Sequence, residues 1–234
     1  MTKIKKSNEH KSRFDEVEDN NFIPALLVMI VAVLAFFLFR ELEREEKANR
    51  PRHNTTIVDQ FITNENILEK LQNRTLWEAC DDSSGGWWDK NSPPTNIWEE
   101  ISAQIWKIRP EYYESSEGFE WWCNILDGRR PLSWHIDKDE KELRLNNRLV
   151  HPIMGAVYYG YKHMFEGGLL QTVDAGAYDN PKELIEWGEV QEIAANFNRL
   201  VVFNASLWHG VSEIRKGERF ALAVNAWEKK PSGY

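Results

Sequence analysis

The N-terminal part of the chain passes from a polar block to an apolar block and back. Residues 1–21 are almost wholly polar and predict a disordered tail, because such a segment cannot bury enough surface to fold alone. Residues 22–39 carry no charge, and their length falls within the roughly 17 to 25 residues that a bilayer-crossing helix needs. A charged stretch, 40–55, follows. The pattern predicts one transmembrane helix at 22–39, followed by a juxtamembrane linker.

A cleaved signal peptide and a buried core helix are the alternatives for this apolar segment. A signal peptide has a shorter apolar region and ends at small residues, whereas Phe36, Phe37 and Phe39 run directly into Arg40. Basic residues flank both ends, so their distribution alone leaves the orientation open. The short basic tail and the large domain after the segment favour a single-pass membrane protein. Its domain would be lumenal, in the endoplasmic reticulum or Golgi of a eukaryotic cell.

Residues 56–234 are predicted to form one folded domain. Two segments near its start, IVDQFITNENILEKLQNRTLWEA and NIWEEISAQIWKI, have apolar residues at helical spacing and predict supporting helices. Between about 118 and 228, short β-rich runs are separated by Gly, Asn, Asp and Pro: EWWCNIL, LSWHID, IMGAVYYGY, GGLLQTV, RLVVFNA and RFALAVNAW. Short strands at this spacing are typical of a sandwich or jelly roll. The predicted fold class is therefore mainly β (α+β), with flanking N-terminal helices.

The charge and cysteine content of the chain exclude some classes of binding partner. A net charge of −8 and a pI near 5.4 oppose binding to a phosphate backbone, so nucleic acid is excluded. The remaining partner classes are the membrane, a protein or peptide substrate, and a small molecule. Cys80 and Cys123 are the only cysteines and lack the spacing of a zinc site. The sequence allows either one disulfide between them or two buried free thiols.

His135 and Asp137 are the first candidate metal ligands. They lie two positions apart in a predicted strand, so their side chains project from the same face. A His-x-Asp triplet alone is a weak signal, but His209 follows a later predicted strand and Arg219 begins the next. Two His and one carboxylate form the facial triad that leaves coordination positions open on iron(II). A structural zinc site would instead fill its shell with protein ligands.

With these motifs in this order, the segment 118–227 resembles the 2-oxoglutarate and iron(II)-dependent dioxygenase superfamily, in its prolyl 4-hydroxylase-like branch. The family pattern runs through a His-x-Asp strand, a tyrosine-bearing strand, a Gly-Gly turn, a strand before the distal His and a later basic residue. Gly167–Gly168 fits the turn. The resemblance implies that His135, Asp137 and His209 bind Fe(II).

The resemblance also implies that Arg219 binds the far carboxylate of the cosubstrate 2-oxoglutarate. Alternation places Arg219, Ala221 and Ala223 on one face, where small side chains leave room beside a guanidinium that can grip a carboxylate with two hydrogen bonds. In GAVYYGY, Tyr159 aligns better than Tyr158 with a tyrosine that touches the cosubstrate. Some relatives carry a hydroxyl two residues after the basic residue. Ala221 departs from that pattern.

The fold that the resemblance implies is a double-stranded β-helix, or jelly roll, with the iron inside one end. The implied reaction uses O2 to hydroxylate a C–H bond while 2-oxoglutarate is converted to succinate and CO2, with ascorbate as a reductant. Peptidyl proline is the leading substrate. The alternatives are a catalytically silent, membrane-tethered jelly-roll binding protein and a cupin-type metal enzyme that does not use 2-oxoglutarate. The intact triad argues against the first, and the second predicts no role for Arg219.

Overall fold

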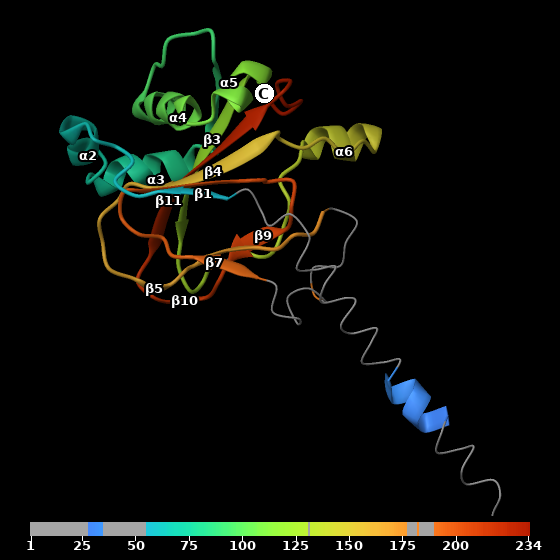
Figure 1. Cartoon of the computed structure of the whole chain (residues 1–234). Coiled ribbons are helices and arrows are strands. Elements are labelled where there is room, and N and C mark those ends of the chain that lie inside the picture. The colour runs from blue at the N-terminus through green and yellow to red at the C-terminus, as the bar shows by residue number, and fades with distance from the viewer. Residues whose placement is uncertain (1–27, 35–54, 131, 177–181, 183–189) are drawn as a thin grey trace, which may run out of the picture. The chain divides into compact units, whose positions relative to one another are not determined.

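A computed structural model describes most of the chain (Figure 1). The described residues are 28–34, 55–130, 132–176, 182 and 190–234. The chain divides into two compact units, residues 1–51 and 52–234. In the first unit the described residues 28–34 are helical and exposed. Every candidate site residue lies in the second unit.

The prediction of a transmembrane helix at 22–39 is wrong. Within the described parts of the chain, none of the helices combines the length and the apolar character that crossing a membrane requires. The predicted single-pass localisation with a lumenal domain is overturned by the same finding. The rest of the segment, the tail 1–21 and the linker up to residue 54 lie outside the described residues.

The second unit is built on a six-stranded antiparallel sheet in the order β1-β8-β4-β11-β3-β2. Its strands are β1 (Thr56–Val58), β8 (Arg199–Phe203), β4 (Met154–Tyr159), β11 (Arg219–Trp227), β3 (Gly118–Leu126) and β2 (Gly86–Asp89). A three-stranded sheet, β7-β6-β9, and a two-stranded sheet, β10-β5, lie on one side of it (Figure 1). Their strands are β5 (Glu166–Gly167), β6 (Leu170–Thr172), β7 (Gln191–Ile193), β9 (His209–Val211) and β10 (Ile214–Lys216).

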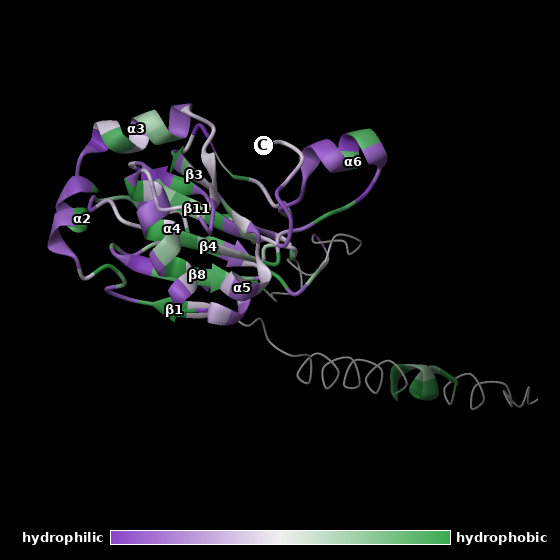
Figure 2. Ribbon diagram, turned by 90° about the horizontal axis from the view of Figure 1, so that it is seen from above, coloured by the Kyte–Doolittle hydropathy of each residue, from purple (hydrophilic) through white to green (hydrophobic). Residues whose placement is uncertain are grey.

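Helices lie over the opposite face of the large sheet (Figures 1 and 2). They are α2 (Glu65–Lys70), α3 (Arg74–Asp82), α4 (Ile97–Lys107) and α5 (Pro110–Ser115), while α6 (Glu140–Asn146) lies beside one end of the sheet. In α4 the buried residues Trp98, Ile101 and Ile105 recur at helical spacing, and the Asn96 side chain caps the first turn. The domain is therefore mixed α/β with a sheet-rich core, which corrects the prediction of a mainly β jelly roll.

Alternation along β11 divides the large sheet between two cores. Phe220, Leu222 and Val224 face the helices and join a cluster rich in tryptophan. Ala221, between them, faces the smaller sheets and belongs to a second cluster. The other buried members of that second cluster are Val157, Tyr159, Leu170, Ile193, Val201, Phe203 and Ala205. One strand thus contributes to both interiors.

The predictions for single elements have different outcomes. The strands expected in EWWCNIL, IMGAVYYGY, RLVVFNA and RFALAVNAW are confirmed as β3, β4, β8 and β11. The strand expected in LSWHID is wrong, because in this segment only His135 pairs, through an isolated bridge to His209. Cys80 and Cys123, whose state the sequence leaves open, form a disulfide that joins α3 to β3.

Candidate metal centre

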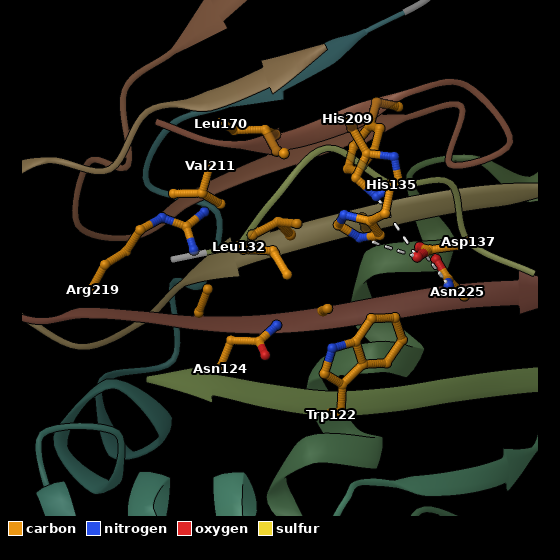
Figure 3. A pocket seen from close by; sticks show the side chains of 16 residues that line it. Trp122, Asn124, Leu132, His135, Asp137, Leu170, His209, Val211, Arg219 and Asn225 are labelled. Atoms are coloured by element: carbon orange, nitrogen blue, oxygen red, sulfur yellow. Dashed lines mark hydrogen bonds and ion pairs between the residues drawn. The ribbon is translucent and has the colours of Figure 1, made fainter. Parts of the chain in front are cut away.

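The structure brings His135, Asp137 and His209 together at one point (Figure 3). Two backbone hydrogen bonds, His135 N–H to His209 O (2.8 Å) and His209 N–H to His135 O (2.9 Å), fix the two histidines side by side. The Asp137 N–H donates to Ala205 O at 3.0 Å and holds the third residue beside them. Ligand atoms of the three residues lie within 4.8 Å of one another. The predicted grouping therefore exists, although its first part is extended chain rather than a strand.

Each histidine presents the same ring nitrogen to Asp137. Nδ1–H of His135 donates to Ser133 O, and Nδ1–H of His209 donates to Leu207 O, both at 2.8 Å. A carbonyl can only accept, so these bonds place a proton on Nδ1, and in the neutral ring the Nε2 lone pair is then free to bind a metal. The Nε2 atoms lie 3.6 Å and 3.7 Å from Asp137 Oδ1. In the neutral form of both rings, these three atoms can all act as metal ligands.

His209 is buried, and this burial lowers its pKa below the ordinary value. Burial thus favours the neutral form of this imidazole, which is the form that binds a metal. Two neutral imidazoles and one carboxylate are the donor set of a facial triad, which suits iron(II) and leaves positions for other ligands. The residues present fit that metal.

Arg219 lies at the far end of a cavity that begins at these three residues (Figure 3). Only 2% of Arg219 is exposed, its Nη2 donates to the Tyr159 hydroxyl at 2.8 Å, and its Nε has no hydrogen-bond partner among the described residues. Ala221 and Ala223 line the cavity beside it, as the alternation of β11 predicts. Its apolar walls are Leu132, Val157, Leu170, Phe203 and Val211.

The two tyrosines of β4 face opposite sides of the sheet. Tyr158 donates its hydroxyl to Asn198 Oδ1 at 3.0 Å within the helix-side core. Tyr159 points the other way and contacts Arg219, with the guanidinium carbon 4.9 Å from the ring centroid. The structure therefore places Tyr159, and not Tyr158, next to the proposed cosubstrate ligand.

The Gly167–Gly168 turn lies against the Arg219 side chain. Both glycines have positive φ, +86° and +65°, a region that other residues rarely adopt. A Cβ added at Gly168 would come within 3.0 Å of Arg219 Cδ. The turn therefore leaves space that the long arginine side chain needs to reach the cavity.

Three cavity residues, Trp122, Asn124 and Asn225, were missed by sequence reasoning. Asn225 carried a usable signal, because alternation from Arg219 along β11 places it on the cavity face. Trp122 and Asn124 lie on β3, opposite Ala223 and Ala221 of β11. Their positions depend on the pairing of two strands far apart in the sequence, so no local pattern indicates them.

Residues 121–227 match the family model of the 2OG-Fe(II) oxygenase superfamily. This segment holds every candidate site residue and is similar to that superfamily. The chain is therefore a dioxygenase, an oxidoreductase by class, and the resemblance seen in its motifs is confirmed. The family match and the His-Asp-His cluster of this oxygenase both support Fe(II) and 2-oxoglutarate as cofactor and cosubstrate. No curated protein matches the chain in sequence.

Solved structures resemble the oxygenase as well. A prolyl-4-hydroxylase from Pseudomonas putida has 15% identity and a TM-score of 0.52, over 76% of this chain and 90% of that one. HygX from Streptomyces hygroscopicus, with nickel and 2-oxoglutarate bound, has 12% identity and a TM-score of 0.49, over 75% and 82%. A collagen prolyl hydroxylase from Paramecium Bursaria Chlorella virus-1 has 12% and 0.48, over 75% and 90%. The first of these similarities shows a shared fold.

Proposed function

We propose that this oxygenase hydroxylates a substrate C–H bond, with iron(II) held by His135, Asp137 and His209 and the far carboxylate of 2-oxoglutarate held by Arg219. The observation that carries the proposal is the buried Arg219, which has no carboxylate partner among the described residues. It stands at the end of a cavity whose other end is the three-ligand cluster. A dicarboxylate that bridges the two ends satisfies both.

The electrostatics of Arg219 favour an anionic ligand. A guanidinium that is buried without an opposite charge is costly, and the Tyr159 hydroxyl supplies only one neutral acceptor. A carboxylate could accept two charge-assisted hydrogen bonds from its planar fork. The small Ala221 leaves the approach to that fork open. In this proposal Arg219 binds and orients the cosubstrate, and Tyr159 holds the guanidinium in place.

At the metal end the chain supplies geometry and charge. The Asp137 carboxylate and two neutral imidazoles leave one net positive charge on iron(II), which favours binding of a dianion. When bound, iron(II) with O2 and 2-oxoglutarate supplies the oxidising chemistry, with succinate and CO2 as products. Leu170 and Val211 contribute apolar walls that limit the access of water. Ascorbate is the proposed reductant.

The substrate side is proposed to be a second cavity that meets the first at the cluster. It is lined by Glu120, Trp122, Lys138 and Glu140, together with His135, Ile136, Asp137 and Asn225. Trp122 lines both cavities and offers a partly exposed indole to a flat or ring-shaped group. Peptidyl proline is the proposed substrate, motivated by the motif resemblance and by the P. putida protein. A small molecule is the alternative.

The test is release of succinate from 2-oxoglutarate with Fe(II), alone and across a panel of proline-containing peptides. Asp137→Ala should abolish turnover, because it removes the only anionic ligand. Arg219→Ala removes charge-assisted hydrogen bonds worth roughly 1.5 to 3 kcal/mol, so the apparent affinity for 2-oxoglutarate should fall about ten-fold or more while iron still binds.

Arg109→Ala is the matched control. Arg109 is partly buried, with 17% of its side chain exposed, but it has its own carboxylate partner, Glu111, and lies outside both cavities. Its loss should leave the dependence on 2-oxoglutarate unchanged. If folded Arg219→Ala behaves like this control, the cosubstrate assignment is wrong and the cupin-type alternative gains. Absence of succinate with every peptide and with cosubstrate alone would favour the silent binding protein.

A further inference from the structure

The two oxygens of the Asp137 carboxylate have different surroundings. Oδ1 faces the Nε2 atoms of His135 and His209, at 3.6 Å and 3.7 Å. Oδ2 points away from them and accepts a hydrogen bond from Asn225 Nδ2 at 2.9 Å (Figure 3). A carboxylate can bind a metal through one oxygen or through both. Here one oxygen faces the cluster while the other is already engaged.

Asn225 is held firmly in the position from which it makes this bond. It lies in the middle of the sheet on β11, paired with Gly155 of β4 and Glu120 of β3, and only 2% of it is exposed. A Cβ at Gly155 would come within 2.9 Å of Asn225 Oδ1 and 2.6 Å of Ala205 Cβ. The absence of that atom creates the space in which the Asn225 amide lies.

The same small region also anchors the backbone of the ligand. Ala205 O accepts the hydrogen bond from the Asp137 N–H at 3.0 Å. The side chain of Asp137 is thus fixed from β11, and its backbone is fixed from the loop after β8. Hydrogen bonds of this kind orient a side chain for metal binding.

We propose that Asn225 is a positioning residue that keeps Asp137 a monodentate ligand. By occupying Oδ2, it leaves only Oδ1 for the metal and reserves for a small ligand the position that a second carboxylate oxygen would take. The inference rests on the proposed function, because it assumes that the three-residue cluster holds a metal. The cavity face of β11 would then have two roles: Asn225 acts at the metal end, and Arg219 acts at the other end.

The experiment uses Co(II) as a spectroscopic probe, titrated into the full-length chain. Visible absorption reports both the affinity and the coordination of cobalt. The variants are Asn225→Leu, which keeps a similar volume without a donor, and Asn225→Ala, which adds no bulk should the first fail to fold. Both should bind Co(II) about ten- to hundred-fold more weakly and with altered absorption bands, the usual size of effect when a partner of a metal ligand is lost.

Asn124→Leu is the matched control. It changes another asparagine of the same cavity, one that makes no hydrogen bond to Asp137. Its Co(II) affinity and spectrum should equal those of the unchanged protein. If folded Asn225 variants also retain both properties, or lose only thermal stability, the positioning role is refuted.

Weak Co(II) binding by the unchanged protein would contradict the proposed function as well. If the unchanged protein binds Co(II) no more tightly than Asp137→Ala, the cluster is no metal site, and the proposed function fails together with the inference drawn from it. The two failures are therefore distinguishable. Failure of the positioning role alone affects only the comparison between the Asn225 variants and the unchanged protein.

Discussion

The two faces of the large sheet differ, although the same strands form both: one face packs into an apolar core, and the other lines a cavity. On the helix side, β11 contributes Phe220, Leu222 and Val224 to a dense core of large side chains. On the other side it contributes Arg219 and Asn225, with only alanines between them. Large apolar residues stabilise one face by burial, whereas small and polar residues on the other leave a cavity. Neighbouring residues of β11 therefore serve different purposes: one faces the core that stabilises the fold, and the next faces the cavity.

The separation matters because a buried arginine and converging metal ligands are unfavourable for folding. Among the residues that the structure describes, Arg219 Nε has no hydrogen-bond partner, and the Nε2 atoms of two histidines face a carboxylate at 3.6 Å and 3.7 Å without a hydrogen bond. The helix-side core must offset that cost. Variants on the two faces should therefore fail in different ways.

The largest effect is expected from loss of the Cys80–Cys123 disulfide on the helix side. The bond closes a loop between residues 43 positions apart. Cys80→Ala combined with Cys123→Ala should therefore lower the free energy of unfolding by about 4 kcal/mol. Denaturant unfolding followed by circular dichroism measures it, and a reductant should lower the stability of the unchanged protein similarly. Intact stability after reduction would contradict the prediction, as would loss of Co(II) affinity in the folded variant.

Leu222→Ala should have the next largest effect. Leu222 is fully buried among the helix-side residues, and such a truncation costs about 3 kcal/mol through lost burial and the cavity left behind. The same unfolding measurement tests it. Because its side chain points away from the cavity, the affinity of the folded variant for Co(II) and 2-oxoglutarate should be unchanged. A drop in either affinity would mean that the two faces are coupled.

The two-residue period of β11 could be predicted from sequence, because alternation is a local property. Arg219, Ala221 and Ala223 were assigned to one face on that basis, and the structure places them along one cavity. The grouping of His135 with Asp137 was also predicted, although no strand forms there. Extended backbone alone is enough to project residues two apart to the same side.

The cavity residues that the sequence did not indicate depend on contacts between segments far apart in the chain. Trp122 and Asn124 reach the cavity only because β3 pairs with β11 in one particular register. The prediction at 22–39 failed for the opposite reason. Hydropathy reports composition, but a membrane crossing also requires a continuous long helix, which the described residues do not contain. Supporting helices were predicted in the two segments that form α2, α3 and α4, whereas α5 and α6 were not predicted, because such short helices are stabilised mainly by packing.

Filling the cavity tests the other face. Ala221→Leu adds bulk between Arg219 and the metal cluster, so the affinity for 2-oxoglutarate should fall about ten-fold, equivalent to 1.4 kcal/mol. The unfolding free energy should change by less than about 1 kcal/mol, because the added atoms enter a cavity rather than a packed core. Isothermal titration with 2-oxoglutarate and a denaturation curve measure the two quantities. A large loss of stability with unchanged affinity would show that the cavity does not accept the cosubstrate.

The smallest effect concerns Glu120, on the cavity face of β3. Its carboxylate accepts hydrogen bonds from Trp227 Nε1 and the Tyr234 hydroxyl, but burial, with the nearby charges of Asp137 and Asp139, raises its pKa above the ordinary 4.5. The folded state therefore holds this proton more tightly than the unfolded state. Stability is lost as the pH rises from the unfolded value through the folded one. Glu120→Gln cannot ionise and should lack that loss.

The melting temperature of Glu120→Gln, relative to the unchanged protein, should therefore increase as the pH rises from about 4 to 7. Any hydrogen bond that the amide makes less well than the carboxylic acid shifts the whole curve and leaves its slope unaffected, so the slope is the quantity to compare. Differential scanning calorimetry across this range measures it, with Glu140→Gln as a control, because Glu140 is exposed. Parallel curves for the Glu120 variant and the unchanged protein would show that the cavity face carries no such ionisation cost.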